Sequence, residues 1–148
     1  MDFELIRAAV EQGVPFNQHL GLEIAELDMG RGVVRLPDNS ALRNHAGSQH
    51  ASALFAAGAA ASGAAFVAVF ADRLQQLTAL VDGATIDYRR IAHGPITATG
   101  VLGSDPEQLH TELERDGRVD FGVDVSLTNG AGDVVAAMTV RWHLREEG

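Results

Sequence analysis

Hydrophobic and polar positions divide the chain into one long apolar stretch and several shorter alternating ones. From Asn44 to Ala71 the only ionisable side chains are those of His45 and His50. The stretch opens with polar residues and continues mostly as Ala and Gly, which is typical of a loop that leads into a buried helix. A helix poor in large side chains lets neighbouring backbone approach closely. We therefore predict a buried central helix that ends near Arg73.

The segments outside this stretch alternate between apolar and polar residues, which is typical of strands with one buried face. Residues 22–36 predict a hairpin that turns at Gly30–Gly32, because the glycines separate two alternating segments. A longer strand is expected over 77–91, with a bend or bulge at Gly83. Three further strands are expected over 96–102, 121–127 and 138–144.

Two other segments have weaker patterns. Residues 2–12 predict a short amphipathic helix, with Asp2 as N-cap and Gly13 as its stop. Residues 14–17 predict a turn, and the acidic segment 104–117 predicts a surface turn with a single helical turn. Strands grouped around one buried helix indicate an α+β domain with an antiparallel sheet, and 1–148 is expected to form a single domain.

Composition and charge exclude several classes of function. Eleven basic residues against 20 acidic ones give a net charge of −9, which argues against nucleic acid as a partner. The absence of cysteine excludes disulfides and thiolate chemistry. The six histidines lack the spacing of a zinc site, so neither metal nor another cofactor is expected.

The same reasoning bears on location. Residues 51–71 are about long enough to span a bilayer, but they are mainly Ala, Gly and Ser, so no membrane partner is expected. The first ten residues are acidic and amphipathic and show no secretory pattern. We therefore expect a cytoplasmic protein.

The polar loop from Asn44 to His50 is the first candidate for chemistry. Backbone N–H groups at a helix start lack intrahelical partners, so they can hold a carbonyl oxygen that becomes negative as it is attacked. The alternative is structural: Asn44 fixes its own turn, Gly47 supplies a positive φ and His50 caps the helix. The residues alone favour this alternative.

The motif Asn44-x-x-Gly47-x-x-His50, followed by small residues and Leu54-Phe55, resembles the loop-to-helix motif of hotdog-fold acyl-CoA thioesterases. The likeness is strongest to the phenylacetyl-CoA-type thioesterases and to the DUF4442 group. Further matching segments are Pro15-Phe16, Leu20-Gly21, Ile86-Asp87-Tyr88 and Gly94. The resemblance implies a hotdog fold, in which an antiparallel sheet wraps around a long central helix.

The resemblance also implies an assembly and a substrate. Hotdog domains pair edge to edge as homodimers, often as dimers of dimers, and bind an acyl-CoA or acyl-carrier-protein thioester between protomers. His50 would orient the thioester carbonyl, the Ala51 N–H would be the oxyanion donor, and Asn44 would shape the loop or contact the water. The residues expected to contact substrate are Gly47, Ser62, Tyr88, Arg89 and Arg90. The two arginines would meet the phosphates of coenzyme A or form a solvated edge.

One position departs from the family pattern. The family places an acidic residue nine positions beyond the histidine, and here that position is Ala59. A methyl group neither accepts a proton from water nor attacks a thioester. Candidate replacements for the carboxylate are Asp82, Ser62 and His50 itself.

Three hypotheses therefore stand. The first is a thioester hydrolase scaffold that is impaired by the alanine. The second is a hotdog protein that binds a thioester without hydrolysing it. A hotdog dehydratase or isomerase is a weaker third hypothesis, because the other acid and histidine placements of those enzymes are missing.

Overall fold

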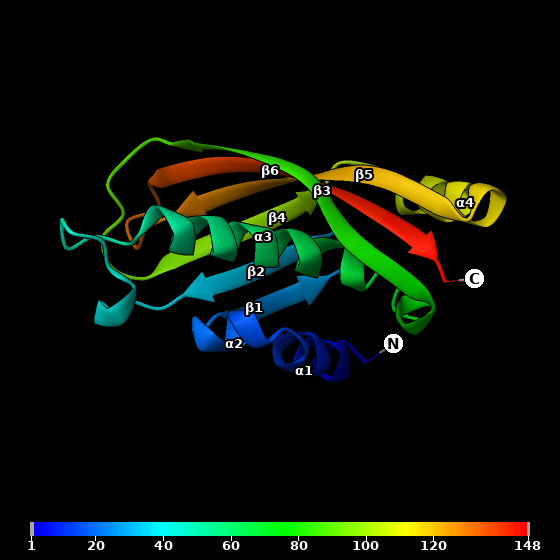
Figure 1. The fold of residues 1–148 in the computed structure, drawn as a ribbon, viewed down its shortest axis with the longest axis horizontal. Helices are drawn as coiled ribbons and strands as arrows, with labels where there is room; N and C mark the ends of the chain where they lie inside the picture. The colour runs from blue at the N-terminus through cyan, green and yellow to red at the C-terminus, as the bar shows by residue number, and fades with distance from the viewer. Residues whose placement is uncertain (1, 148) are drawn as a thin grey trace.

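A six-stranded antiparallel sheet curves around helix α3 in the computed structural model, which describes residues 2–147 (Figure 1). The strand order is β1-β2-β4-β5-β6-β3. The strands are β1 (Glu23–Asp28), β2 (Arg31–Leu36), β3 (Leu77–Tyr88), β4 (Ile96–Leu102), β5 (Arg118–Thr128) and β6 (Val134–Glu146). The helices are α1 (Phe3–Gly13), α2 (Pro15–His19), α3 (Ala51–Val67) and α4 (Pro106–Asp116), with short 3₁₀ turns η1 (Ser40–Leu42) and η2 (Leu74–Gln76).

The α+β class and the antiparallel sheet predicted from the sequence are confirmed. The bulge expected at Gly83 is present, because the pairing of β3 with β6 shifts register between Val81 and Gly83. Asp2 caps α1 by accepting the Glu4 N–H at 3.0 Å. Within residues 2–147, no helix combines the length and the apolar character that crossing a membrane requires.

Three local predictions were wrong. The central helix ends at Val67, and residues 68–73 form turns instead of a last helical turn. Residues 15–17 begin the short helix α2, and Val14 is its N-cap. The segment 104–117 contains the 11-residue helix α4, which buries Leu109 and Leu113 on one face. The helix ends at Asp116 and is followed by the cap residue Gly117, where φ is +72°. The helix was not predicted because acidic residues dominate the segment, and only two leucines, one helical turn apart, are buried.

Helix α3 lies unusually close to the middle of the sheet. Gly32 of β2 and Gly100 of β4 are direct cross-strand partners beneath it. A Cβ atom at Gly100 would lie 2.6 Å from the Ala61 carbonyl oxygen, and one at Gly32 would lie 2.5 Å from the Ala64 Cβ. The two glycines therefore make a flat seat for a helix face built of alanines.

The two edge strands of the sheet, β1 and β3, differ in how far they are covered. On the β1 edge, the Ile24 N–H donates to Glu11 Oε2 at 2.9 Å, and Arg7 Nη1 donates to the Ile24 carbonyl oxygen at 3.3 Å. Side chains of α1 thus occupy polar backbone groups that an edge strand would otherwise expose. The β3 edge has no such cover among the described residues, and Leu80 and Val81 on it are about half exposed, at 51% and 49%.

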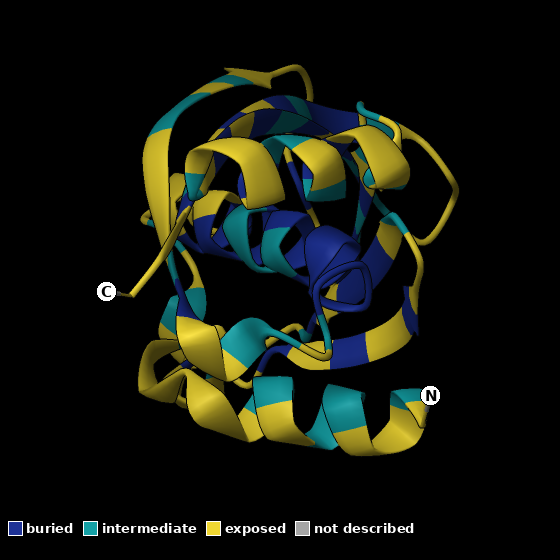
Figure 2. Cartoon of the chain, turned by 90° about the vertical axis from the view of Figure 1, so that its right-hand side faces the viewer, coloured by how far each residue is buried: buried dark blue, intermediate teal, exposed yellow. Residues whose placement is uncertain are grey.

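Figure 2 shows where the core lies. Buried residues gather around α3 and on the inner face of the sheet, whereas α1 carries only intermediate and exposed residues. Helix α1 therefore contributes a partial cover at the sheet edge and no core of its own. The face of α3 that turns away from the sheet remains partly accessible at Phe55, Ala59 and Gly63.

Candidate functional site

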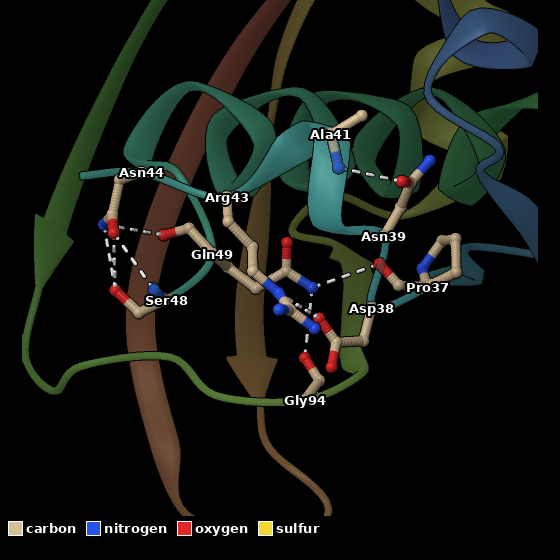
Figure 3. Close-up of polar contacts among 9 residues, drawn as sticks. All are labelled: Pro37, Asp38, Asn39, Ala41, Arg43, Asn44, Ser48, Gln49 and Gly94. Atoms are coloured by element: carbon tan, nitrogen blue, oxygen red, sulfur yellow. Dashed lines mark hydrogen bonds and ion pairs between the residues drawn. The ribbon is translucent and has the colours of Figure 1, made fainter. Parts of the chain in front are cut away.

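The side chain of Asn44 organises the loop that precedes α3. Its Oδ1 accepts the N–H of Ala46 at 2.9 Å. It also accepts the N–H of Ser48 at 3.0 Å, and its Nδ2 donates to Ser48 Oγ at 2.9 Å (Figure 3). Gly47 sits at the tip of the loop with φ +79°. Asn44 therefore shapes the loop, and Gly47 supplies the positive φ that the turn requires.

Gln49 anchors this loop and was missed by the sequence analysis. Its Nε2 donates to the carbonyl oxygens of Pro37 at 3.1 Å and Gly94 at 3.0 Å, as Figure 3 shows. Its backbone N–H donates to the Ala92 carbonyl oxygen at 2.8 Å. The side-chain Oε1 is buried without a partner among the described residues. The two carbonyl acceptors fix the orientation of the amide, because only its nitrogen can donate. Through these bonds Gln49 links its own loop at the helix start to the segments around residues 37 and 94.

His50 is the N-cap of α3. Its Nδ1 accepts the Ser52 N–H at 2.9 Å. A neutral imidazole that accepts at Nδ1 carries its proton on Nε2. The ring is therefore a hydrogen-bond donor through Nε2–H, and it is not free to act as a base through Nδ1. The side chain borders a cavity of about 220 Å³ together with Phe16, Leu20 and Arg43.

The N–H of Ala51 is the free donor at this helix start. The N–H groups of the next three residues have acceptors on His50, whereas that of Ala51 has none within residues 2–147. Ala51 borders a second cavity, of about 380 Å³, and four other predicted site residues share this lining: Asn44, Tyr88, Arg89 and Arg90. The structure thus brings five predicted residues together around one hollow.

Tyr88 and the two arginines come from the end of β3. The Tyr88 hydroxyl donates to the Ala51 carbonyl oxygen at 2.9 Å. Partial burial raises the pKa of the Tyr88 phenol, so the hydroxyl stays protonated and keeps its role as a donor. The backbone N–H groups of Arg89 and Arg90 both donate to the Val135 carbonyl oxygen, at 2.8 and 3.2 Å. Neither guanidinium forms an ion pair with a carboxylate among the described residues.

Ser62, which was assigned to the site from the sequence, does not line the cavity around Ala51. The residue is fully buried at 0% exposure. Its hydroxyl donates to the Ala59 carbonyl oxygen at 2.7 Å and accepts the Trp142 indole N–H at 2.9 Å. Ser62 is therefore a core residue whose hydroxyl is paired with Trp142 and with the backbone of α3.

Within one chain, Ala59 is also separate from the loop. It lies eight residues beyond Ala51, which is about 12 Å along a helix. It borders a third cavity with Gly63, Val81 and Trp142, and no acidic side chain lines that cavity. The proposed substitute Asp82 is exposed at the β3 bulge and lines none of these three cavities.

The fold defines a class of protein. An antiparallel sheet around one central helix is the hotdog fold, and solved structures of thioesterase-type proteins share this scaffold. The sequence profile of the domain of unknown function DUF4442 matches residues 3–144. The chain therefore belongs to the DUF4442 family.

Solved structures of similar proteins agree with this assignment. The Pseudomonas aeruginosa protein of unknown function PA5026, named "Probable Thioesterase", is 30% identical, with 99% of this chain and 97% of that chain covered and a TM-score of 0.82. Escherichia coli PaaI, from the phenylacetic acid degradation operon, is 22% identical, with 98% and 94% covered and a TM-score of 0.73. A thioesterase family protein from Silicibacter pomeroyi is 17% identical, with 99% and 100% covered and a TM-score of 0.78. The last two show the fold alone. No curated protein matches the chain.

Proposed function

We propose that the protein binds acyl-CoA or acyl-carrier-protein thioesters on a hydrolase scaffold whose hydrolytic step is impaired by Ala59. The proposal is carried by the N–H of Ala51, which has no acceptor among the described residues. Beside it, His50 Nδ1 accepts the Ser52 N–H, which leaves Nε2–H as a second donor. The proposal assigns both donors to the thioester carbonyl, whose oxygen gains negative charge as it is attacked.

The cavity around Ala51 suits the carrier part of the substrate. Arg89 and Arg90 border it and have no carboxylate partner among the described residues, so both charges are available for the phosphates of coenzyme A. The net charge of −9 would repel such an anion elsewhere on the surface. A cytoplasmic location, where such thioesters are used, is part of the proposal.

The proposed assembly is a homodimer paired along β3, which associates further as a dimer of dimers. The support is the asymmetry of the sheet, whose β1 edge is covered by Arg7 and Glu11 while β3 keeps exposed apolar residues. In such a pair the loop of one protomer faces α3 of its partner, which would place position 59 beside the thioester. Light scattering should give at least twice the 15.7 kDa chain mass, and a monomer at micromolar concentration would refute the shared site.

The alternative function is thioester binding without turnover. It is favoured by one specific observation: no acidic side chain lines the cavity that contains Ala59. Binding would then serve to hold or present an acyl group, and the hydrolytic step would be absent.

Restoring a carboxylate separates these two functions. Ala59→Glu should raise the rate of thioester hydrolysis by about 10²-fold or more, since a positioned general base contributes roughly 10²–10⁴. Ala59→Gln is the matched control, because it adds the same bulk without a base, and Ala59→Asp tests a shorter reach. The assay follows free thiol released from short-chain, long-chain and aryl acyl-CoAs.

Each result has a definite reading. Rapid turnover by the unaltered protein would mean that another residue supplies the base, and the impairment would be refuted. No gain in a folded, dimeric Ala59→Glu protein would favour the binding function. His50→Ala should weaken thioester binding more than His93→Ala, an exposed control; equal effects would refute the role assigned to the helix start.

A further inference from the structure

The charged residues that border the cavity around Ala51 are both arginines. All 11 basic residues of the 148-residue sequence are arginines, and the sequence contains neither lysine nor cysteine. Arg89 and Arg90 line the cavity, which has a volume of about 380 Å³. We propose that this site holds an acyl thioester without taking up its acyl group, because Arg89 and Arg90 supply positive charge in a form that a thioester does not modify. This inference rests on the proposed thioester binding.

An acyl thioester is an acylating agent, and a protein that binds one exposes its own nucleophiles to it. A neutral amine attacks the carbonyl carbon, so that a C–N bond forms and the C–S bond breaks. The sulfur leaves as a thiolate and takes the proton that the nitrogen releases, which gives an amide and a free thiol. A cysteine thiolate takes the acyl group in the same way through its sulfur. Lysine and cysteine are therefore the side chains most open to this transfer.

Arginine binds anions as lysine does, but it does not take part in this transfer. Attack requires an unprotonated nitrogen, and at pH 8 a lysine with its ordinary pKa is neutral in about 0.4% of molecules. For arginine the neutral fraction is smaller by about a hundredfold or more, and the positive charge is delocalised over the guanidinium. The planar guanidinium also binds a phosphate through two parallel hydrogen bonds. Arginines at positions 89 and 90 thus provide affinity for anions without an acyl acceptor.

The two hydroxyl groups that line the same cavity are both engaged. Ser48 is buried, and its Oγ donates to Asn44 Oδ1 at 3.2 Å and accepts from Asn44 Nδ2 at 2.9 Å. The Tyr88 hydroxyl donates to the Ala51 carbonyl oxygen at 2.9 Å. Partial burial raises the pKa of the Tyr88 phenol, so this hydroxyl stays protonated and is a poor nucleophile. The residues that line the cavity include no base that would remove either proton.

The histidine at the helix start is occupied as well. His50 borders the neighbouring cavity together with Ser52. Its Nδ1 accepts the Ser52 N–H at 2.9 Å, so this nitrogen is not free to attack a thioester or to activate the Ser52 hydroxyl. Nε2 then carries the proton and acts only as a donor. The nucleophiles around the helix start are thus either protonated or hydrogen-bonded.

The test replaces each arginine with lysine, which keeps the charge and adds an amine. Arg89→Lys and Arg90→Lys are incubated with saturating acetyl-CoA or octanoyl-CoA at pH 8, and acylated residues are located by peptide mass mapping. Binding raises the local concentration of thioester beside the new amine, and the neighbouring arginine lowers the pKa of that amine. We expect acylation at the substituted position at least tenfold faster than in the control variant, and no acylated side chain in the unaltered protein.

Arg145→Lys is the matched control. Arg145 is exposed and lies directly opposite Arg118 in the pairing of β5 with β6, so the new amine would again have an arginine beside it. Arg145 borders none of the three cavities that α3 lines. An S-propyl coenzyme A thioether, which cannot transfer an acyl group, should abolish the faster acylation of Arg89→Lys. It should leave the slow acylation of Arg145→Lys unchanged. Circular dichroism confirms that each variant is folded.

The outcomes distinguish this inference from the proposed function. If the unaltered protein acquires an acyl group on a serine, tyrosine or histidine at the helix start, the site is an acyl acceptor and the inference is overturned. If Arg89→Lys and Arg90→Lys bind the thioether but are acylated no faster than Arg145→Lys, the arginines protect nothing. Thioester binding then stands and the inference is overturned. If the thioether does not bind to the unaltered protein, the proposed function is refuted and the inference with it.

Discussion

The close packing of α3 on the sheet can be tested by adding one methyl group at Gly100. The new Cβ would lie 2.6 Å from the Ala61 carbonyl oxygen, 2.9 Å from its carbonyl carbon and 3.3 Å from the Ser62 nitrogen, against at least 3.4 Å in ordinary contact. All three obstacles are backbone atoms of a helix, so no side-chain rotation relieves the overlap. Either α3 must lift from the sheet or β4 must bend away from it.

The expected loss of stability follows from two opposing effects. Overpacking in a well-packed core costs about 1–3 kcal/mol, and a backbone obstacle places Gly100→Ala at the upper end. Replacing glycine by alanine within a strand stabilises the folded state by about 0.5–1 kcal/mol, because the unfolded chain then loses less conformational freedom on folding. The net decrease in the free energy of unfolding is therefore about 2 kcal/mol. For a chain of this length it lowers the melting temperature by about 4–8 °C.

Gly122→Ala provides the control within the same sheet. It lies on the neighbouring strand β5, and a Cβ there meets nothing within 4 Å. Urea unfolding followed by circular dichroism, at one fixed protein concentration, compares the two variants with the unaltered chain. We expect Gly122→Ala to unfold at an equal or slightly higher midpoint. A Gly100→Ala midpoint equal to that of Gly122→Ala would show that α3 does not pack closely against Gly32 and Gly100.

Two further variants test the loop at the helix start. Gln49→Glu should destabilise the fold by about 2 kcal/mol at pH 7, because the new oxygen would face two backbone carbonyls that now accept hydrogen bonds. The control is Gln18→Glu at an exposed position, which should have almost no effect on the urea midpoint. Similar midpoints for both variants would contradict the anchoring role of Gln49. Tyr88→Phe should lower the free energy of unfolding by about 0.5–1 kcal/mol through loss of the 2.9 Å bond to the Ala51 carbonyl oxygen. Thermal melts that superimpose on those of the unaltered protein would show that this bond contributes nothing.

Features with local signals could be predicted from the sequence. The alternation of apolar and polar residues located the strands, and the Ala-rich stretch located α3, because side-chain period and composition are set residue by residue. The cap at Asp2 and the bulge at Gly83 were also predicted, since each depends on one residue type in a short segment. The loop motif indicated the thioesterase-type scaffold, whereas the loss of a family carboxylate at Ala59 stays a prediction.

Tertiary structure decided whatever depends on distant segments meeting. Ser62 appeared available for chemistry in the sequence, but Trp142, 80 residues away, brings the indole that captures its hydroxyl. Gln49 acquired its anchoring role only because residues 37 and 94 present their carbonyl oxygens to one amide. The cavity that Ala59 borders and the covered β1 edge arise in the same way, because the relative placement of α1, α3 and β3 is fixed by packing across the whole chain and leaves no local pattern.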